Sequence, residues 1–397
     1  MSAISAKRAG ADQVLLLDAS ERPGTKIVMS GGGRCNLTNA ELDFRDFRGE
    51  SANGIKKVIL QFPPEKVIQF FNSLGVKTKT EEPWHKIFPV SDSAQTVLST
   101  LLNEVRKNHV NLKFPEKVIS FSFDKSLWKV TTQNEVFLGR SLVLAPGGFS
   151  YPHTGSDGVL WKVLEKLGVS LVSPKAALTT LKCSDQDLHT LSGLTIWCRF
   201  RVRVDGKVIF NQENSLLFTH DGLSGPGILN ASEWFTGNDL KKPAELSISF
   251  FPNENENEIR DWLGSEIKKT PASKLIRLLK TKLPERLAVA LENRLDSPDI
   301  SIGHLSKEKR NKLIELLTDF KPVISGHSGY KKAEVTAGGI PFSELNLATM
   351  EFKRFPGLYA AGEIVNVHGI IGGYNFQWAW SSGWVAGKSA SEKINGG

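Results

Sequence analysis

The sequence predicts an α/β protein whose mostly parallel sheet is interrupted by an inserted antiparallel β unit and a small helical unit. Short, continuously apolar runs end in an acid or a glycine turn, as at Val14–Asp18 and Ser141–Gly148. Such runs are typical of strands buried on both faces of a parallel sheet. From about residue 184 the pattern changes to alternating apolar and polar residues, as in antiparallel strands, and apolar runs return after about residue 330. The parallel-sheet domain is therefore predicted to be discontinuous.

A chain of 397 residues is long enough for two or three packed units. We expect one domain from residues 1–183 and 323–397, an inserted β domain at 184–252 and an inserted helical domain at 253–322. Prolines divide the helical domain into several short helices. The strands expected in the β domain are Thr195–Val204, Lys207–Phe210, Ser215–Thr219 and Ala244–Phe251.

The composition, with 40% hydrophobic and 23% charged residues, is that of an ordinary globular protein. A net charge of +8 raises the question of a nucleic-acid or membrane partner. The basic residues, however, are spread along the chain, and those at 268–286 and 307–312 alternate with apolar positions, as on a solvated helix face. We therefore expect a small-molecule substrate, no nucleic-acid partner and no membrane partner; a steep salt dependence of nucleic-acid affinity would contradict this. Lacking a secretory signal or a long apolar stretch, the protein is expected in the cytoplasm.

The cysteines and histidines predict no metal site. Cys35, Cys183 and Cys198 have neither disulfide nor zinc-ligand spacing, and the histidines are scattered. Cys35 has no second cysteine nearby in the sequence, so we expect a packed side chain rather than a redox thiol. His220, between a predicted strand and a predicted helix, is a candidate acid or base at neutral pH. A hydrogen bond that only stabilises the turn is the alternative.

Acidic and glycine-rich strand ends form a candidate nucleotide site. Asp18 ends a buried strand soon after a helix, where an acid accepts hydrogen bonds from ribose hydroxyls in dinucleotide-binding folds. A charged residue where a strand meets solvent is the alternative. The turn Ala145-Pro146-Gly147-Gly148 and the pair Gly362-Glu363 follow two further strands. Because open α/β sheets bind ligands at the carboxyl ends of their strands, we expect these segments on one rim.

Two glycine-rich segments would let a ligand approach the backbone. Gly31-Gly32-Gly33 removes three consecutive side chains, and Arg34 adds a fixed positive charge; a flexible loop is the alternative. Gly372-Gly373-Tyr374-Asn375 opens the last helix, which we expect Asn375 to cap. The positive end of that helix would stabilise the negative charge of a reduced flavin.

These segments, in this order, resemble the BaiN/YhiN-like family of NAD(P)/FAD-dependent oxidoreductases, also described as aminoacetone-oxidase-like FAD-binding enzymes. The resemblance covers essentially the whole chain, and its most specific motifs are the glycine-rich arginine loop and the block around Gly373. The matching stretches are Lys26–Asn39, Phe88–Ser91, Ala145–Gly155, Leu217–Pro226, Val335–Gly339, Thr349–Glu351 and Gly357–Gly387.

The resemblance implies a Rossmann-like FAD-binding domain in two segments and a flavoenzyme. It would move a hydride or electrons from a reduced nicotinamide, NAD(P)H, or from an organic donor to a small molecule. Reduction of a carbon–carbon double bond and oxidation of an amine are both left open, as is the oligomeric state. The residues that the resemblance assigns to FAD are Asp18, Gly31, Gly32, Gly33, Arg34, Asn36, Val118, Ala145, Gly147, Gly148, Gly362, Glu363, Gly373, Tyr374 and Asn375.

The sequence departs from the family at its start. Family members open with a strand and a Gly-x-Gly-x-x-Gly turn ahead of the helix that residues 2–9 continue, and this sequence has neither. That strand lies in the middle of the sheet, so its loss should leave backbone groups unpaired and a slot in the core. We therefore expect Met1 to lie inside the first helix of a longer natural chain. A FAD-free binding or scaffold protein is the alternative function.

Overall fold

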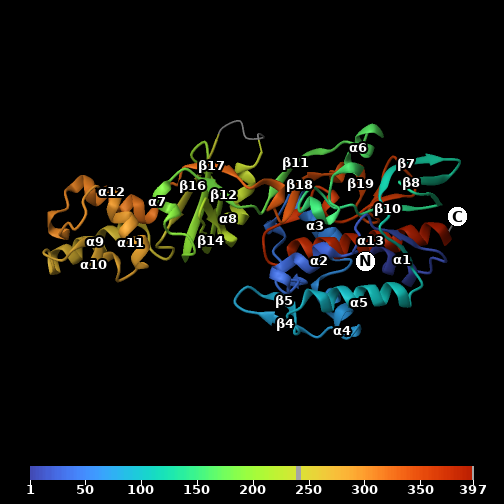
Figure 1. Ribbon diagram of the computed structural model, residues 1–397, viewed down its shortest axis with the longest axis horizontal. Helices are drawn as coiled ribbons and strands as arrows, with labels where there is room; N and C mark the ends of the chain where they lie inside the picture. Colours follow the sequence, from blue (N-terminus) through green and yellow to red (C-terminus); the bar gives the residue numbers. More distant parts are fainter. Residues whose placement is uncertain (238–242, 396–397) are drawn as a thin grey trace. The chain divides into compact units, whose positions relative to one another are not determined.

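The computed structural model describes residues 1–237 and 243–395. The chain folds into two compact units (Figure 1). One unit combines Met1–Ala176 with Tyr330–Gly397, and the other is Ala177–Gly329. The first carries parallel strand pairs and helices, and the second carries an antiparallel sheet with short helices. The predicted α/β class, with a sheet domain made of two chain segments, is confirmed. The division of the insertion at residue 252 stays a prediction.

The parallel strands of the first unit follow the apolar runs. β1 (Leu15–Leu17) pairs in parallel with β6 (Asn111–Lys113), and β10 (Leu142–Leu144) pairs in parallel with β21 (Leu358–Ala360). Among the described strands, neither β1 nor β10 has a hydrogen-bonded neighbour on its other edge. Leu15 is 37% exposed, so the prediction that this strand is buried on both faces is wrong. The free edge of β1 borders a pocket rather than another strand.

The long C-terminal helix α13 (Tyr374–Asn395) joins the two segments of the first unit by packing along α1 (Ser2–Arg8). The helices touch at the backbone, because a Cβ on Gly387 would lie 2.1 Å from the carbonyl oxygen of Ser2. The Ser5 hydroxyl donates a hydrogen bond to the Trp384 carbonyl at 2.7 Å. The N-terminal helix is thus held by the other end of the chain.

The remaining elements of the first unit surround these strands. No helix in the described ranges is long and apolar enough to cross a membrane. The helices are α2 (Thr25–Met29), α3 (Ala52–Ile59), α4 (Pro64–Ser73), α5 (Ala94–Lys107) and α6 (Val159–Lys166). The strands are β2 (Thr38–Asn39), β3 (Phe47–Arg48), β4 (Thr78–Glu81), β5 (Lys86–Pro89), β7 (Val118–Asp124), β8 (Leu127–Thr132), β9 (Val136–Gly139), β11 (Val172–Ala177), β18 (Val335–Gly339), β19 (Leu345–Asn346), β20 (Glu351–Phe352) and β22 (His368–Gly369).

A six-stranded antiparallel sheet, in the order β16-β13-β14-β15-β12-β17, forms the second unit's framework. β13 has its predicted bounds, but β14 is continuous, so the prediction of separate strands at 207–210 and 215–219 is wrong. The polar residues between them stay in the ladder because β13 offers polar partners: Glu213 lies opposite Arg199 and accepts a hydrogen bond from it at 2.7 Å. The strands are β12 (Leu181–Cys183), β13 (Thr195–Val204), β14 (Lys207–Phe218), β15 (Gly222–Ser224), β16 (Ala244–Ser249) and β17 (Ile324–His327).

Short helices share one apolar core with this sheet. Phe200 and Ile248 from the sheet and Leu263, Leu279 and Leu291 from the helices belong to one cluster, and each is at most 2% exposed. As predicted, prolines separate the short helices after the β strands. The helices are α7 (Gln186–His189), α8 (Pro226–Ala231), α9 (Glu256–Lys269), α10 (Leu275–Leu279), α11 (Glu285–Asn293) and α12 (Lys307–Thr318).

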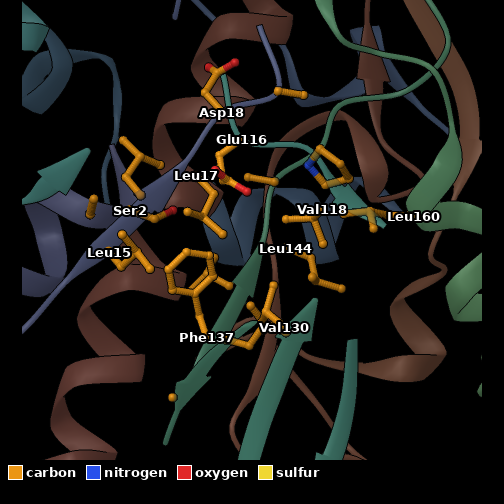
Figure 2. Close-up of a pocket in the computed structure, with 18 of the residues that line it drawn as sticks. Ser2, Leu15, Leu17, Asp18, Glu116, Val118, Val130, Phe137, Leu144 and Leu160 are labelled. Atoms are coloured by element: carbon orange, nitrogen blue, oxygen red, sulfur yellow. The ribbon is translucent and has the colours of Figure 1, made fainter. Parts of the chain in front are cut away.

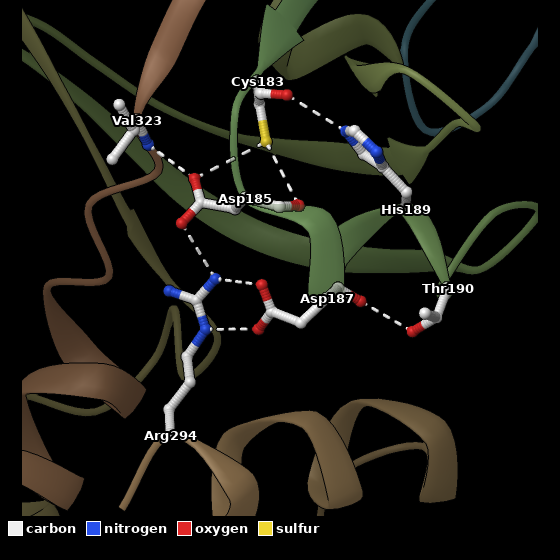
Figure 3. Close-up of polar contacts among 7 residues, drawn as sticks. All are labelled: Cys183, Asp185, Asp187, His189, Thr190, Arg294 and Val323. Atoms are coloured by element: carbon white, nitrogen blue, oxygen red, sulfur yellow. Dashed lines mark hydrogen bonds and ion pairs between the residues drawn. The ribbon is translucent and has the colours of Figure 1, made fainter.

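Arg294, directly after α11, links the helices to the segment that follows β12 (Figure 3). Its guanidinium donates to Asp187 at 2.6 and 2.7 Å and to Asp185 at 3.0 Å. Asp185 also accepts a hydrogen bond from the Val323 N–H at 2.7 Å. The side chains of Arg294 and Asp185 are only 22% and 13% exposed, so the loss of one partner would leave a charge poorly solvated.

Replacing Arg294 with alanine should lower the free energy of unfolding by about 2–4 kcal/mol, because two partly buried carboxylates lose their cation. The shift of the urea unfolding transition of the full chain measures this effect. Arg260→Ala is the matched control, since Arg260 pairs with Glu256 at 2.8 Å on the surface of α9 with 45% of its side chain exposed. That loss should be at most about 0.5 kcal/mol. Equal shifts for the two variants would contradict the role assigned to Arg294.

Candidate cofactor site

A pocket of about 970 Å³ lies between β1 and β10 in the first unit (Figure 2). Leu15 and Leu17 line it from β1, Leu142 and Leu144 line it from β10, and Phe137 lines it from β9. The strands that border it both leave an edge unpaired within the described chain. Along its strands the pocket is thus a gap between two unpaired edges, where the sequence predicted unpaired backbone groups and a slot in the core, and polar residues such as Asp18 and Glu116 lie at the strand ends.

Four of the fifteen predicted FAD residues line this pocket, namely Asp18, Val118, Ala145 and Gly147. The other eleven are not among its lining residues: Gly31, Gly32, Gly33, Arg34, Asn36, Gly148, Gly362, Glu363, Gly373, Tyr374 and Asn375. The Asp18 carbonyl accepts a hydrogen bond from the Glu116 N–H at 2.7 Å, which brings the start of β7 beside the end of β1. Gly147 has a φ of +75°, a conformation that favours glycine. Asp18 and the turn at Ala145–Gly147 therefore line the same pocket.

Glu363 organises a second part of the site. Its carboxylate accepts hydrogen bonds from the Thr336 N–H at 2.8 Å and from the Lys26 ammonium. Gly148 lies against the same group, because a Cβ there would be 2.4 Å from Thr336 Oγ1 and 2.8 Å from Glu363 Oε1. Lys26 also lines the pocket. Lys26 and Thr336 were not predicted as site residues, although both lie in stretches that match the family.

The glycine-rich loop lies against the turn before α13. With its amide oriented by its partners, Asn36 accepts a hydrogen bond from the Gly373 N–H at 3.0 Å and donates to the Thr38 carbonyl at 2.9 Å. A Cβ on Gly373 would lie 2.4 Å from the Thr38 carbonyl, and its φ is +97°. Gly31, Gly32 and Gly33 also have positive φ. The Gly372-Gly373 turn thus contacts the residues that follow the glycine-rich loop, through the Asn36 side chain and the Thr38 backbone.

Two cations flank this loop. The Arg34 guanidinium lies 4.1 Å from the centre of the Phe88 ring and pairs with Glu81 at 2.7 Å and Asp92 at 3.4 Å. Its charge is therefore already balanced by two carboxylates. Lys86 lies opposite Asn39 in the β2–β5 pair, and burial lowers the pKa of its ammonium while Glu81 opposes that change. Lys86 is thus a less compensated cation beside the loop.

The last motif plays a larger structural role than the sequence suggested. α13 begins at Tyr374, so the prediction that Asn375 caps it is wrong: Gly373, with its left-handed φ, precedes the helix. The Asn375 amide instead exchanges two hydrogen bonds with the Gly369 backbone, both at 2.9 Å. The Tyr374 hydroxyl donates to Asp46 at 3.2 Å, and burial raises the pKa of Tyr374.

Neither Gly362 nor His220 is among the residues that line the pocket. The Gly362 N–H donates to the Ser382 hydroxyl at 2.9 Å, and the Gly362 carbonyl accepts from the Trp378 indole at 3.1 Å, so α13 uses both backbone groups. His220 lies in the turn between β14 and β15 of the second unit with 81% of its side chain exposed. Its Nε2 is 4.0 Å from the Asp221 carboxylate. A catalytic role for His220 stays a prediction.

The whole chain matches one family. Residues 1–389 match the HI0933-like protein Rossmann domain. The chain belongs to the HI0933-like family. This is the FAD-binding, oxidoreductase-type family that the sequence motifs indicated, and the predicted Rossmann-like domain is confirmed.

Relatives of this HI0933-like protein carry different names. It is 33% identical over 382 residues to a ribosomal RNA dihydrouridine synthase of Escherichia coli, a match that covers 94% of this chain and 90% of the relative. It is 28% identical over 396 residues to a 3-dehydro-bile acid delta(4,6)-reductase of Clostridium scindens, covering 99% and 96%. Among solved structures, the E. coli quinol fumarate reductase superposes with a TM-score of 0.51 at 13% identity, covering 99% of this chain and 68% of that one; this likeness concerns the fold.

The described residues of the HI0933-like protein fit FAD. Gly148 and Gly373 pack against the protein itself, because a Cβ on either would lie 2.4 Å from Thr336 Oγ1 or from the Thr38 carbonyl, so these two glycines shape the backbone beside the pocket. Asp18 and the Lys26–Glu363 pair supply the polar groups at and beside the pocket. Asp18 would hold the ribose and Gly147-Gly148 the diphosphate, as in other dinucleotide-binding folds.

Replacing Gly373 with alanine should weaken FAD binding at least tenfold, because the new Cβ forces the turn away from Thr38. A spectroscopic titration of the apoprotein with FAD measures the affinity. Gly75→Ala is the matched control: Gly75 also has a positive φ, +88°, but a Cβ there meets nothing within 4 Å. Gly75→Ala should lose about 1–2 kcal/mol from the strained backbone alone, and Gly373→Ala should lose more because its Cβ also meets Thr38, so the FAD affinity is compared on folded protein of each variant. An unchanged affinity in Gly373→Ala would remove this turn from the site.

The three cysteines should be unreactive in the folded protein. All are buried, and burial raises the pKa of Cys35 to about 12, that of Cys183 to about 11 and that of Cys198 as well. At pH 8 about a thousandth or less of the Cys35 and Cys183 thiols would be ionised, so a disulfide reagent should label them only after urea unfolding. Rapid labelling of one native thiol would contradict the packed role predicted for Cys35.

Proposed function

We propose that this protein is a flavin-dependent reductase that saturates the ring double bond of uracil in RNA. The observation that carries the proposal is the similarity, over nearly the full length of both chains, to a relative named ribosomal RNA dihydrouridine synthase. Dihydrouridine differs from uridine by two hydrogens across one carbon–carbon double bond. A protein that makes it needs a hydride donor and a proton source at an RNA base.

The bile acid reductase relative supports the proposed reaction, reduction of a carbon–carbon double bond, but does not support RNA as the substrate. A delta(4,6)-reductase, by its name, also reduces carbon–carbon double bonds. Two relatives with different substrates therefore share one reaction type, and reduction of a double bond is favoured over the oxidation of an amine. The proposal replaces the expectation of a small-molecule substrate without a nucleic acid, which rested on the apparent spread of basic residues.

The chemistry that bound FAD supplies is the transfer of a hydride, taken from a reduced nicotinamide, to one carbon of the double bond, while a proton reaches the other. The chain's own residues bind and orient the cofactor. Asp18 would accept hydrogen bonds from the ribose, and Glu363 would be held in place by Lys26 and Thr336. The N-terminus of α13, behind Gly373, would stabilise negative charge on the flavin edge.

The direct test incubates the FAD-loaded protein with NADH or NADPH and protein-free ribosomal RNA, followed by mass spectrometry of the nucleosides. We expect uridine to gain two hydrogens in a reaction that depends on protein, FAD and nicotinamide. The same protein is tested with an unsaturated steroid ketone and with simple amines. Turnover of either of these without any dihydrouridine would overturn the RNA substrate. A purified protein without flavin absorbance that takes up no added FAD would instead favour the scaffold alternative.

A further inference from the structure

One segment in the helical part of the second unit is rich in basic residues, although residues 253–322 as a whole carry 14 lysines and arginines and 12 aspartates and glutamates. Residues 268–286 contain seven lysines and arginines and one glutamate, a net +6, compared with +8 for the whole chain. This is one of the two stretches that the sequence predicted to be a solvated helix face, and that interpretation stays a prediction. The residues of this basic surface are Lys268, Lys269, Lys274, Arg277, Lys280, Lys282 and Arg286, and all seven are exposed.

The fold turns these residues to the outside. Leu275, Leu278 and Leu279 of α10 are at most 7% exposed and pack in the core of the second unit. Arg277 and Lys280 lie three residues apart on the opposite side of the same helix, and side chains at this spacing are neighbours on a helix surface. The basic surface is therefore held on a packed element rather than on a loose tail.

Several of these charges lack a carboxylate partner. In the described part of the chain, neither Lys268 nor Arg277 forms an ion pair. Arg286 donates to the carbonyl groups of Thr190 and Ser192, which position the guanidinium without neutralising it. The basic surface thus holds at least three uncompensated positive charges. The four lysines that do pair have these partners: Lys269 with Glu266, Lys274 with Asp299, Lys280 with Glu285, and Lys282 with Glu254.

We propose that the basic surface binds the phosphate backbone of the RNA substrate. That the ligand is RNA rests on the proposed function. That it binds at this surface rests on the charge and exposure of these residues. Lysine and arginine side chains bind phosphates by releasing condensed counterions, and this contribution does not depend on base sequence. Exposed cations without carboxylate partners lose no ion pair when a phosphate binds. The basic surface would supply affinity and leave recognition of the uracil to the cofactor site.

The test compares Lys268→Gln/Arg277→Gln with wild type in binding a protein-free ribosomal RNA and a short oligouridylate over a range of salt concentrations. Neither substitution breaks an ion pair, so the fold should be unaffected. Removing one cation that binds a phosphate should reduce the slope of log affinity against log salt by about 0.7–0.9, which gives about 1.5 for the double variant. Its affinity for RNA should fall about tenfold near 0.1 M salt, and FAD affinity should not change.

Lys57→Gln/Lys166→Gln is the matched control, with the same change of net charge at two exposed lysines of the first unit. We expect its salt dependence to match wild type. An equal loss in both double variants would show a general charge effect and overturn the basic surface as a site. If Lys268→Gln/Arg277→Gln binds RNA as tightly as the wild type does, the basic surface is not an RNA-binding site. If the wild type still forms dihydrouridine in that case, the proposed function remains intact. Dihydrouridine formation is measured separately, so its absence counts against the proposed function.

Discussion

The α/β unit depends on the backbone-level approach of two chain segments that are far apart in sequence. Helix α13 comes so close that a Cβ on Gly387 would meet Ser2 and a Cβ on Gly373 would meet Thr38. Between these points the fully buried Gln377 amide donates to the Phe62 carbonyl at 2.8 Å. Only glycine permits such an approach at a positive φ, as at Gly373, or where backbones touch. The glycines of the last motif therefore hold the fold together before they can serve a ligand.

The residues predicted to bind the cofactor fall into two groups, according to whether their polar groups already have partners within the protein. The polar groups of Tyr374, Asn375 and Gly362 are already used by hydrogen bonds within the protein. Asp18 and Gly147, by contrast, line the pocket, and Gly148 touches the Glu363 carboxylate beside it. A glycine-rich motif can thus act on a cofactor indirectly, by fixing the backbone that the cofactor would contact.

The sequence predicted what depends on local pattern and missed what depends on distant partners. The strand at Thr195–Val204 was predicted at its observed bounds because alternation is a local signal. The continuity of β14 was missed, since its polar centre is stabilised by a facing strand. Lys26 was missed because its partner Glu363 is 337 positions away. The predicted burial of Leu15 was wrong, because an apolar run indicates a strand but does not show what covers it, and here Leu15 borders the pocket.

The distribution of charge matters more than its total. At physiological ionic strength, exposed charges act over a Debye length of about 8 Å, so a ligand senses the nearest few residues rather than the net charge of the chain. A chain of 397 residues with +8 is only weakly basic on average. Residues 268–286 carry +6, and the carboxylates paired with four of their lysines leave Lys268, Arg277 and Arg286 without a carboxylate partner in the described chain. Alternation with apolar residues does not make such a segment inert, because the apolar side is the one that the core covers. A solvated helix face and a phosphate-binding face share this pattern and differ in whether carboxylates neutralise the cations.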